Sequence, residues 1–195
     1  MAQYIDLDSI LRDREDYPNE NDYQLSPQQV EGWFRNSRVV TPLPQNPNTY
    51  PLGFVSSISI VDLALPYSSL LATMPRVYIN FTSMLYRDVN LVQTINSSLP
   101  DAKFVCKYDK IQYDSLNTPI WIHYKCDMDQ VMRFERRDPI QFQVLTRSGN
   151  VLPQQDTNVP ADADPLKQTL CTLSITPYIQ DGKFDNQMVE TLNTS

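Results

Sequence analysis

The stretch FVSSISIVDLALP, residues 54–66, holds the strongest fold signal in the sequence. Apolar residues first alternate with polar ones at Ile58 and Ile60, and the alternation then changes phase to Val61, Leu63 and Leu65. Alternation with a period of two is typical of a β-strand that has one buried face. A change of phase within one strand predicts either a β-bulge or a segment that is buried on both faces.

Segments with the same period of two follow on both sides of this stretch. The clearest is RVYINFT, residues 76–82, in which Tyr78 and Asn80 are predicted to face solvent. Further strands are predicted at 38–41, 103–108, 119–126, 131–136, 138–146 and 168–176. The residues predicted to form the core are Val77, Ile79, Phe81, Ile120, Ile122, Phe142 and Val144.

The connections between these segments indicate how the strands are arranged. The chain has 15 Pro but only 4 Gly, and its connections are long and contain almost no Asn-Gly or Asp-Gly turns. Such connections argue against an up-and-down meander, which needs tight hairpins. About eight antiparallel strands joined in this way predict an all-β fold, a single Greek-key or jelly-roll β-sandwich.

Charge divides the chain into three predicted parts. Residues 1–31 contain eight acidic and two basic residues, a balance of −6, whereas the whole chain carries −7. We therefore predict an extended acidic arm at 1–25, the sandwich at 26–180 and a tail at 181–195. Without a basic face the sandwich is not predicted to bind nucleic acid. No apolar run approaches the ~18 residues of a membrane span.

One short helix is predicted near residues 27–35. Ser26 followed by Pro27 is typical of a helix start, and the helix places Trp33 and Phe34 among its apolar residues. These two side chains either pack on the domain or form a surface contact.

The sequence contains little that predicts catalysis, a metal or a cofactor. Its glycines are scattered, and its one histidine, His123, is predicted to face solvent or to form hydrogen bonds. The three cysteines, Cys106, Cys126 and Cys171, lie on apolar strand faces, so buried and unreactive thiols are expected. We predict a protein that is not an enzyme and holds no cofactor. Paired carboxylates such as Asp127 and Asp129 keep a glycosidase site open as an alternative.

The N-terminal third carries a resemblance to a known family. The residues that carry it are Asp8-Ser9, Arg12-Asp13-Arg14, Tyr17-Pro18-Asn19, Asp22-Tyr23 and the strand from Ile58 to Pro66. In these segments the chain resembles small β-sandwich virion proteins of the nucleocytoplasmic large DNA viruses, which include the algal phycodnaviruses. The resemblance implies a minor capsid protein with a jelly-roll fold, which cements capsomers of the major capsid protein from the inner face of the shell.

The resemblance also implies partners and a location. The expected partners are the major capsid protein and other minor capsid proteins, with self-association of this chain in the shell as a further option, in a virion assembled in the host cytoplasm. An arm of this composition is predicted to become ordered against the domain or a partner, with aromatic and Arg side chains as anchors. The anchors expected in it are Tyr4, Arg12, Arg14, Tyr17 and Tyr23.

A second function remains open on the sequence. A β-sandwich of a virion fibre or tail can bind a carbohydrate or a receptor, and Trp121 on a predicted strand is a candidate platform for stacking on a sugar or for another surface contact. Exposed aromatic rings in a concave site favour this alternative, whereas aromatic rings covered by other chains favour a capsid cement.

Overall fold

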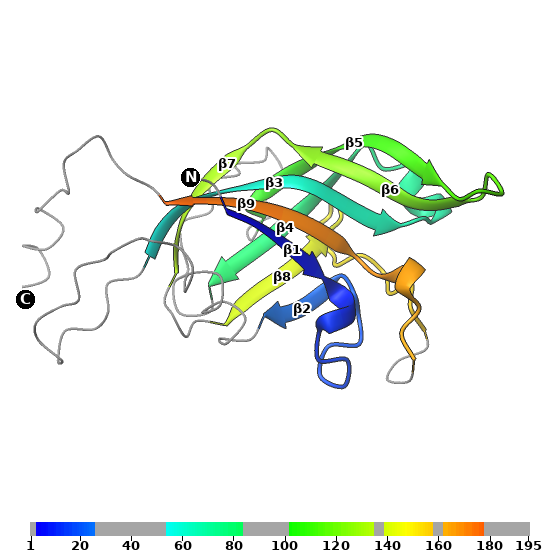
Figure 1. Cartoon of the computed structure of the whole chain (residues 1–195), viewed down its shortest axis with the longest axis horizontal. Coiled ribbons are helices and arrows are strands. Elements are labelled where there is room, and N and C mark those ends of the chain that lie inside the picture. The colour runs from blue at the N-terminus through cyan, green and yellow to red at the C-terminus, as the bar shows by residue number, and fades with distance from the viewer. Residues whose placement is uncertain (1–2, 26–53, 84–101, 135–138, 158–161, 178–195) are drawn as a thin grey trace, which may run out of the picture.

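We describe the protein from a computed structural model, which defines residues 3–25, 54–83, 102–134, 139–157 and 162–177 (Figure 1). The helix predicted near 27–35, with Trp33 and Phe34, lies outside the described residues. So do the strand predicted at 38–41 and the tail at 181–195.

The described residues form one antiparallel sheet of nine strands. These strands are β1 (Gln3–Asp8), β2 (Asp22–Leu25), β3 (Phe54–Pro66), β4 (Arg76–Ser83), β5 (Phe104–Tyr113), β6 (Pro119–Cys126), β7 (Asp129–Phe134), β8 (Ile140–Leu145) and β9 (Leu170–Pro177). Three short helical turns lie between them: η1 (Ser9–Leu11), α2 (Ser69–Ala72) and η2 (Pro165–Lys167). The predicted all-β class is confirmed.

The strand pairing has jelly-roll topology. Along the sheet the order is β1-β9-β3-β6-β5-β4-β8-β2, and β7 pairs with β3 next to β6. The pairs β1–β9, β2–β8, β3–β6/β7 and β4–β5 join the two halves of the chain as one long antiparallel hairpin. The pairs β9–β3, β6–β5 and β4–β8 form when this hairpin is rolled up. Rolling places β3, β6, β7 and β9 over β4, β8 and β2 (Figure 1).

The stretch at 54–66 behaves as its pattern predicts. Its pairing with β9 shifts register between Ile60 and Asp62, which places a β-bulge at Val61. Beyond the bulge Leu63, Ala64 and Leu65 are all buried, so this end of β3 is covered on both faces. One edge of β3 pairs with β7 before the bulge and with β6 after it.

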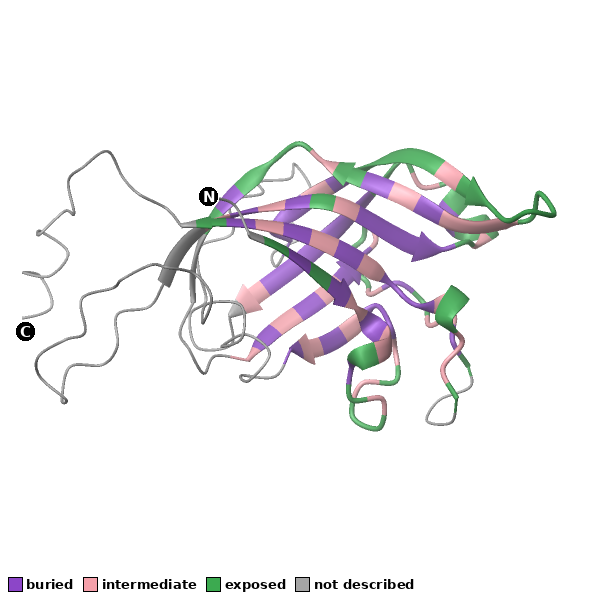
Figure 2. Ribbon diagram, in the orientation of Figure 1, coloured by how far each residue is buried: buried purple, intermediate pink, exposed green. Residues whose placement is uncertain are grey.

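The core lies between the two layers, where buried and half-buried residues alternate along the strands (Figure 2). Six of the seven predicted core residues are at most 1% exposed: Val77, Ile79, Phe81, Ile122, Phe142 and Val144. Ile120 is only half-buried, because it lies near the tip of the β5–β6 hairpin, beyond the first residue of β4.

Two residues of β4 were wrongly predicted to face solvent. Tyr78 is buried in a small second cluster with Ala102 and Leu145, on the outer face of the sheet. Asn80 is buried on the same face and donates a hydrogen bond to Gln143 Oε1 at 2.8 Å. Both errors arise because distant segments cover the outer face of β4, which the local pattern does not reveal.

The segment predicted as an extended arm, residues 1–25, is ordered against the domain over residues 3–25, where it forms two strands of the sheet and is not a separate arm. β1 pairs with β9 from Gln3 to Asp8, and β2 pairs with β8 from Asp22 to Leu25. The inward side chains of these two strands, Ile5, Leu7, Tyr23 and Leu25, belong to the main core. The acidic residues of β1 alternate with the apolar ones, so the negative charge of this segment lies on one face of an ordinary edge strand.

Candidate functional site

Four connections of the jelly roll meet at one end, which we call the loop end. They are residues 9–21, 67–75, 114–118 and 146–169, of which 158–161 lie outside the described residues. They meet because each joins strands whose paired termini lie at the same edge; for example, Asp8 and Ala64 both pair with Leu170. In Figure 1 this end lies on the right.

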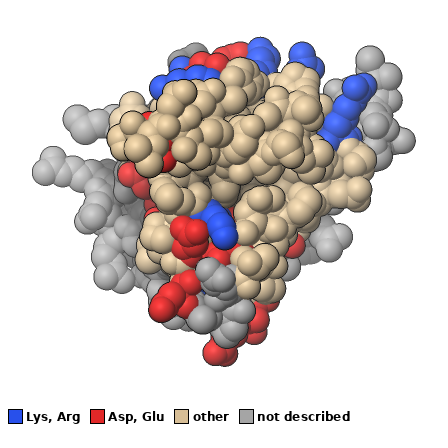
Figure 3. Space-filling view, turned by 90° about the vertical axis from the view of Figure 1, so that its right-hand side faces the viewer, with Lys and Arg blue, Asp and Glu red and all other residues tan. Residues whose placement is uncertain are grey.

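Exposed apolar side chains are concentrated at the loop end. Each of the four connections contributes at least one large apolar side chain that is more than a third exposed. These side chains, with that of Tyr113 next to the 114–118 connection, are Leu11, Tyr67, Leu70, Tyr113, Leu116 and Leu166. Viewed end-on, most of the surface here is uncharged; charged side chains lie toward the margins and in one small mixed group near the lower centre of the view (Figure 3). Contiguous exposed apolar patches often mark interaction sites, so the loop end is the candidate contact surface of the described residues.

Each of the four exposed leucines lies on a turn whose backbone is held by a side-chain oxygen. Asp8 accepts a hydrogen bond from the backbone N–H of Ile10, next to Leu11. Asp114 and Asp164 accept from the N–H groups of Leu116 and Leu166 at 2.8 and 3.0 Å. Ser68 accepts from Leu71 N–H, next to Leu70. These turns hold the leucines in place before any partner binds, which lowers the entropy cost of association.

The tip of the β5–β6 hairpin is the most exposed of these turns. Asp114 Oδ1 accepts from both Leu116 N–H and Thr118 N–H, and Asn117 has a positive φ of 60°. Asn tolerates this left-handed conformation better than most residues. Leu116 is therefore 84% exposed at the tip of an ordered turn.

The α2 turn is attached to the core by one buried side chain and by hydrogen bonds from Tyr124. Leu71 is buried, and the buried hydroxyl of Tyr124 donates to the carbonyl oxygens of Leu71 at 3.1 Å and Met74 at 3.3 Å. Leu70, the preceding residue, consequently points away from the core. The exposed leucines were not predicted from the sequence, although the spacing Asp-x-Leu at 114–116 and 164–166 is typical of a capped turn.

Arg12 is buried inside the domain, whereas its predicted role as a partner-binding anchor requires an exposed side chain. It is 7% exposed, and its guanidinium donates to the carbonyl oxygens of Ser9, Tyr17 and Pro18 and to Gln168 Oε1, all within 2.8 Å. Burial lowers the pKa of Arg12, and the Glu20 carboxylate acts in the opposite direction. Arg12 ties the 9–21 connection to the start of β9.

The other predicted anchors are divided between the interior and the surface. Tyr23 is buried in the core, and its hydroxyl has no hydrogen-bond partner among the described residues. The half-buried Tyr17 donates to Gln24 Oε1 at 2.9 Å. Tyr4 is exposed, and Arg14 is half-exposed and makes its own interactions. Only Tyr4 therefore has the exposure expected of an anchor.

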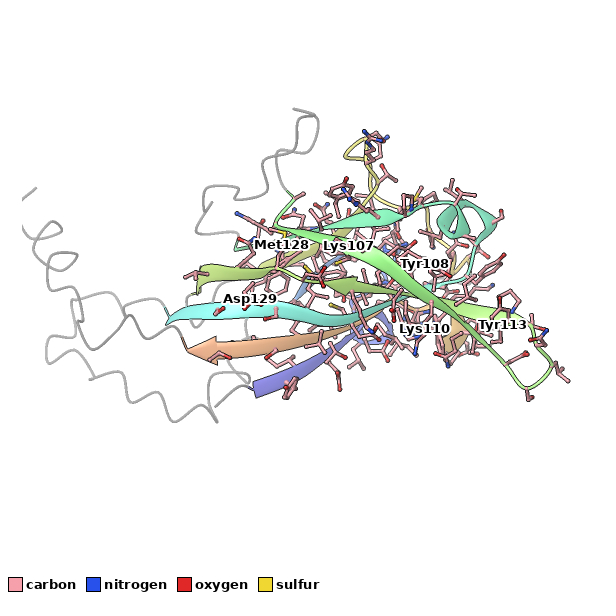
Figure 4. All side chains as sticks on the ribbon, turned by 90° about the horizontal axis from the view of Figure 1, so that it is seen from above. Lys107, Tyr108, Lys110, Tyr113, Met128 and Asp129 are labelled. Carbon is pink, nitrogen blue, oxygen red and sulfur yellow. The ribbon has the colours of Figure 1, made fainter. Side chains whose placement is uncertain are left out.

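The outer face of the β5–β6 hairpin carries charges that are largely paired. Lys107 binds Asp127 at 2.7 Å, and Lys125 binds Asp109 at 3.1 Å. Figure 4 shows Lys107, Tyr108, Lys110 and Tyr113 in order toward the hairpin tip. Exposed ion pairs of this kind contribute only ~0–1 kcal/mol, so they keep this face polar without adding much stability.

His123, on the same face, connects three neighbouring strands through its two ring nitrogens. His123 Nδ1 lies 3.0 Å from Asp62 Oδ2, and Nε2 lies 2.8 Å from Gln112 Oε1. These contacts join β6 to β3 and β5, as the predicted hydrogen-bonded role of His123 requires.

The residues that kept a glycosidase site and a sugar-binding site open are engaged in separate contacts. Trp121 is half-buried, and its indole nitrogen is fully buried without a hydrogen-bond partner among the described residues. Asp127 is paired with Lys107, and Asp129 accepts a hydrogen bond from the Ser59 hydroxyl. The two carboxylates are thus directed to different partners.

A narrow cleft lies between the two edges of the sheet. β1 and β2 border a cavity of about 270 Å³ that is lined by Asp6, Leu7, Asp8, Leu11, Arg12, Tyr23, Gln24 and Leu25. Sites for drug-sized ligands usually enclose roughly 300–1,000 Å³. This cleft is therefore small for such a ligand.

Cys126 departs from the prediction of inert thiols. Cys106 and Cys171 are buried as predicted, and burial raises the pKa of Cys171. Cys126 is only half-buried, and a hydrogen bond with Cys106 lowers the pKa of Cys126 to about 7. The same hydrogen bond and burial raise the pKa of Cys106.

Alkylation should therefore distinguish the three thiols. Since the thiolate is the nucleophile, the rate of Cys126 alkylation by iodoacetamide should rise with pH and reach half its plateau near pH 7. Cys106 and Cys171 should stay unmodified in the folded protein. Peptide mass spectrometry across pH 5.5 to 9 measures each site. A midpoint for Cys126 near its ordinary pKa of ~8.5 would contradict the assignment.

Among the described residues, no cluster of three or more His, Cys, Asp or Glu side chains has the geometry to hold a metal ion. None of the helices in this part of the chain is long and apolar enough to span a membrane.

Comparison with known proteins adds no relative. Neither the models of known protein families nor the curated protein sequences contain a match to this chain.

Proposed function

We propose that this protein is a non-enzymatic structural component of a virus capsid, a minor capsid protein that cements capsomers of the major capsid protein from the inner face of the shell. The proposal is supported by the likeness of the N-terminal third to minor capsid proteins of large DNA viruses and by the jelly-roll topology. Fold alone does not imply function, so the main support comes from the surface of the loop end.

The loop end supplies the observation that carries the proposal. Four leucines project from capped turns, and Tyr67 and Tyr113 lie beside two of these turns. Apolar and aromatic side chains on a rigid frame are the composition of the core of a protein interface. A cement protein needs a preformed, exposed contact surface of this kind. An enzyme instead needs a cavity that can hold its substrate.

Particle fractionation tests the proposal. In cells that produce the virus encoding this chain, the chain should co-sediment with mature particles and should be located under the capsomers in a cryo-electron-microscopy map of the particle. A chain that stays in the soluble fraction after particles are pelleted, or that lies in fibres on the outer surface, would overturn the proposal.

Substitutions at the hairpin tip should reduce incorporation into particles. Leu116→Asp combined with Tyr113→Ser removes two exposed apolar side chains, and a loss of ~2 kcal/mol at an interface hot spot corresponds to roughly 30-fold weaker binding. The melting temperature should change little, because both side chains are exposed. Immunoblotting of purified particles measures incorporation.

The matched control is Val131→Asp, which introduces the same charge at an exposed apolar residue of β7, away from the loop end. This variant should be incorporated like the unmodified protein. Equal incorporation of the tip variant and the control would exclude the hairpin tip as a contact.

A further inference from the structure

Two cysteines face each other across the β5–β6 hairpin. Cys106 and Cys126 are direct partners in the antiparallel register. Direct partners in such a pair have Cα atoms ~4.5–5.5 Å apart, and disulfides span ~4.4–6.8 Å between Cα atoms. Side chains of direct partners also share one face of the sheet, so the two sulfur atoms lie on the same side of the hairpin.

The two thiols differ in access to solvent. Cys106 belongs to the main core and is fully buried, whereas Cys126 is half-buried at the end of β6. The Cys126 thiol also donates a long hydrogen bond to Met128 O at 3.6 Å. An oxidant can therefore reach Cys126 first, and Cys106 is already in position to react with it.

We propose that Cys106 and Cys126 are a redox-active pair that closes to a cross-strand disulfide on reaction with a low-molecular-weight disulfide of the glutathione class. This modification site goes beyond the proposed capsid function and does not depend on it.

The chemistry proceeds by two thiol–disulfide exchanges. The Cys126 thiolate attacks one sulfur of oxidised glutathione, which forms a mixed disulfide and releases one glutathione thiolate. The Cys106 sulfur then attacks Cys126 Sγ while its proton passes to the departing glutathione sulfur, which forms the Cys106–Cys126 bond and releases the second glutathione as a thiol. The two cysteine sulfurs are oxidised, and one glutathione disulfide is reduced to two thiols.

The bond would brace the hairpin that reaches the loop end. Residues 107–125 lie between the two cysteines, and they include Tyr113 and Leu116. A cross-link at the base of this hairpin limits how far its strands can separate in the unfolded state, which stabilises the folded state.

Oxidation of the folded full-length chain tests the proposal. The protein is incubated with oxidised glutathione at pH 8, and the products are mapped by mass spectrometry after non-reducing digestion. We expect free thiols to fall from three to one, with a Cys106–Cys126 cross-link and an unmodified Cys171. The melting temperature should rise by roughly 5–10 °C.

Two variants separate the steps. Cys106→Ala should stop at a stable glutathione adduct on Cys126, while Cys171→Ala should form the same disulfide as the unmodified chain. Should Cys106→Ala not fold, the peptide map of the unmodified chain decides by itself. Three free thiols, a lasting glutathione adduct in the unmodified chain, or a disulfide that involves Cys171 would each overturn the proposal.

Discussion

Deletion of residues 1–25 should unfold the protein instead of releasing a folded core. The deletion removes β1 and β2, which are the two edge strands of the jelly roll. It also removes four core side chains, Ile5, Leu7, Tyr23 and Leu25. At ~1.5–3 kcal/mol for each buried side chain, this loss is comparable with the ~5–15 kcal/mol that separates most folded domains from the unfolded state.

Circular dichroism, gel filtration and thermal melting measure the effect. The truncated chain should aggregate or show no cooperative transition. A finer test compares Leu7→Ala, which should cost ~2–5 kcal/mol as a core truncation, with Tyr4→Ala on the same strand, whose side chain is exposed. The segment would be an independent arm if the truncated chain melted cooperatively near the temperature of the full chain.

Replacement of Arg12 by Ala should destabilise the fold by ~3–5 kcal/mol, the usual effect of removing one member of a buried charged network. Four acceptors lose a donor: the carbonyl oxygens of Ser9, Tyr17 and Pro18, and Gln168 Oε1. The buried Glu20, whose pKa burial already raises, would also lose a nearby positive charge.

Urea unfolding at pH 7 measures this loss. Arg12→Lys should fall between the unmodified protein and Arg12→Ala, because an ammonium group cannot reproduce the planar fork of a guanidinium. The matched control is Glu15→Ala in the same connection, where the side chain is exposed and a change within ±0.5 kcal/mol is expected. An Arg12→Ala variant as stable as this control would show that the network is dispensable.

These two predictions change where the proposed capsid contacts are expected. Arg12 and Tyr23 are needed inside the domain, so they cannot also serve as anchors for a neighbouring subunit. The exposed leucines of the loop end take that role in the proposal, together with Tyr67 and Tyr113. The N-terminal segment thus supplies part of the framework of the domain, and the turns at one end supply the proposed contact surface.

The strand pattern could be predicted because it is local. Val77, Ile79 and Phe81 alternate with other residues, and a β-strand directs alternate side chains to opposite faces whatever its neighbours are. The phase change in residues 54–66 likewise predicted the bulge at Val61, which the register confirms. Long connections without tight turns were enough to favour a jelly roll over a meander.

The nature of the N-terminal segment could not be predicted in the same way. Its acidic residues are dense enough to resemble a disordered arm, and the alternation of Ile5 and Leu7 with Asp6 and Asp8 spans only a few residues. Whether such a segment is an arm or a strand depends on a free partner edge. The sheet supplies two, on β9 and β8, and both are distant in the sequence.

The sequence by itself thus determined the all-β class, most strand positions and most of the core, because these follow from side-chain periodicity along single strands. The tertiary structure alone decided the burial of Arg12, the pairing of Cys106 with Cys126 and the gathering of four capped turns at the loop end. Each of these features joins residues of different segments, so it depends on strand pairing and register. Pairing and register follow from the packing of the whole core, which no local pattern contains.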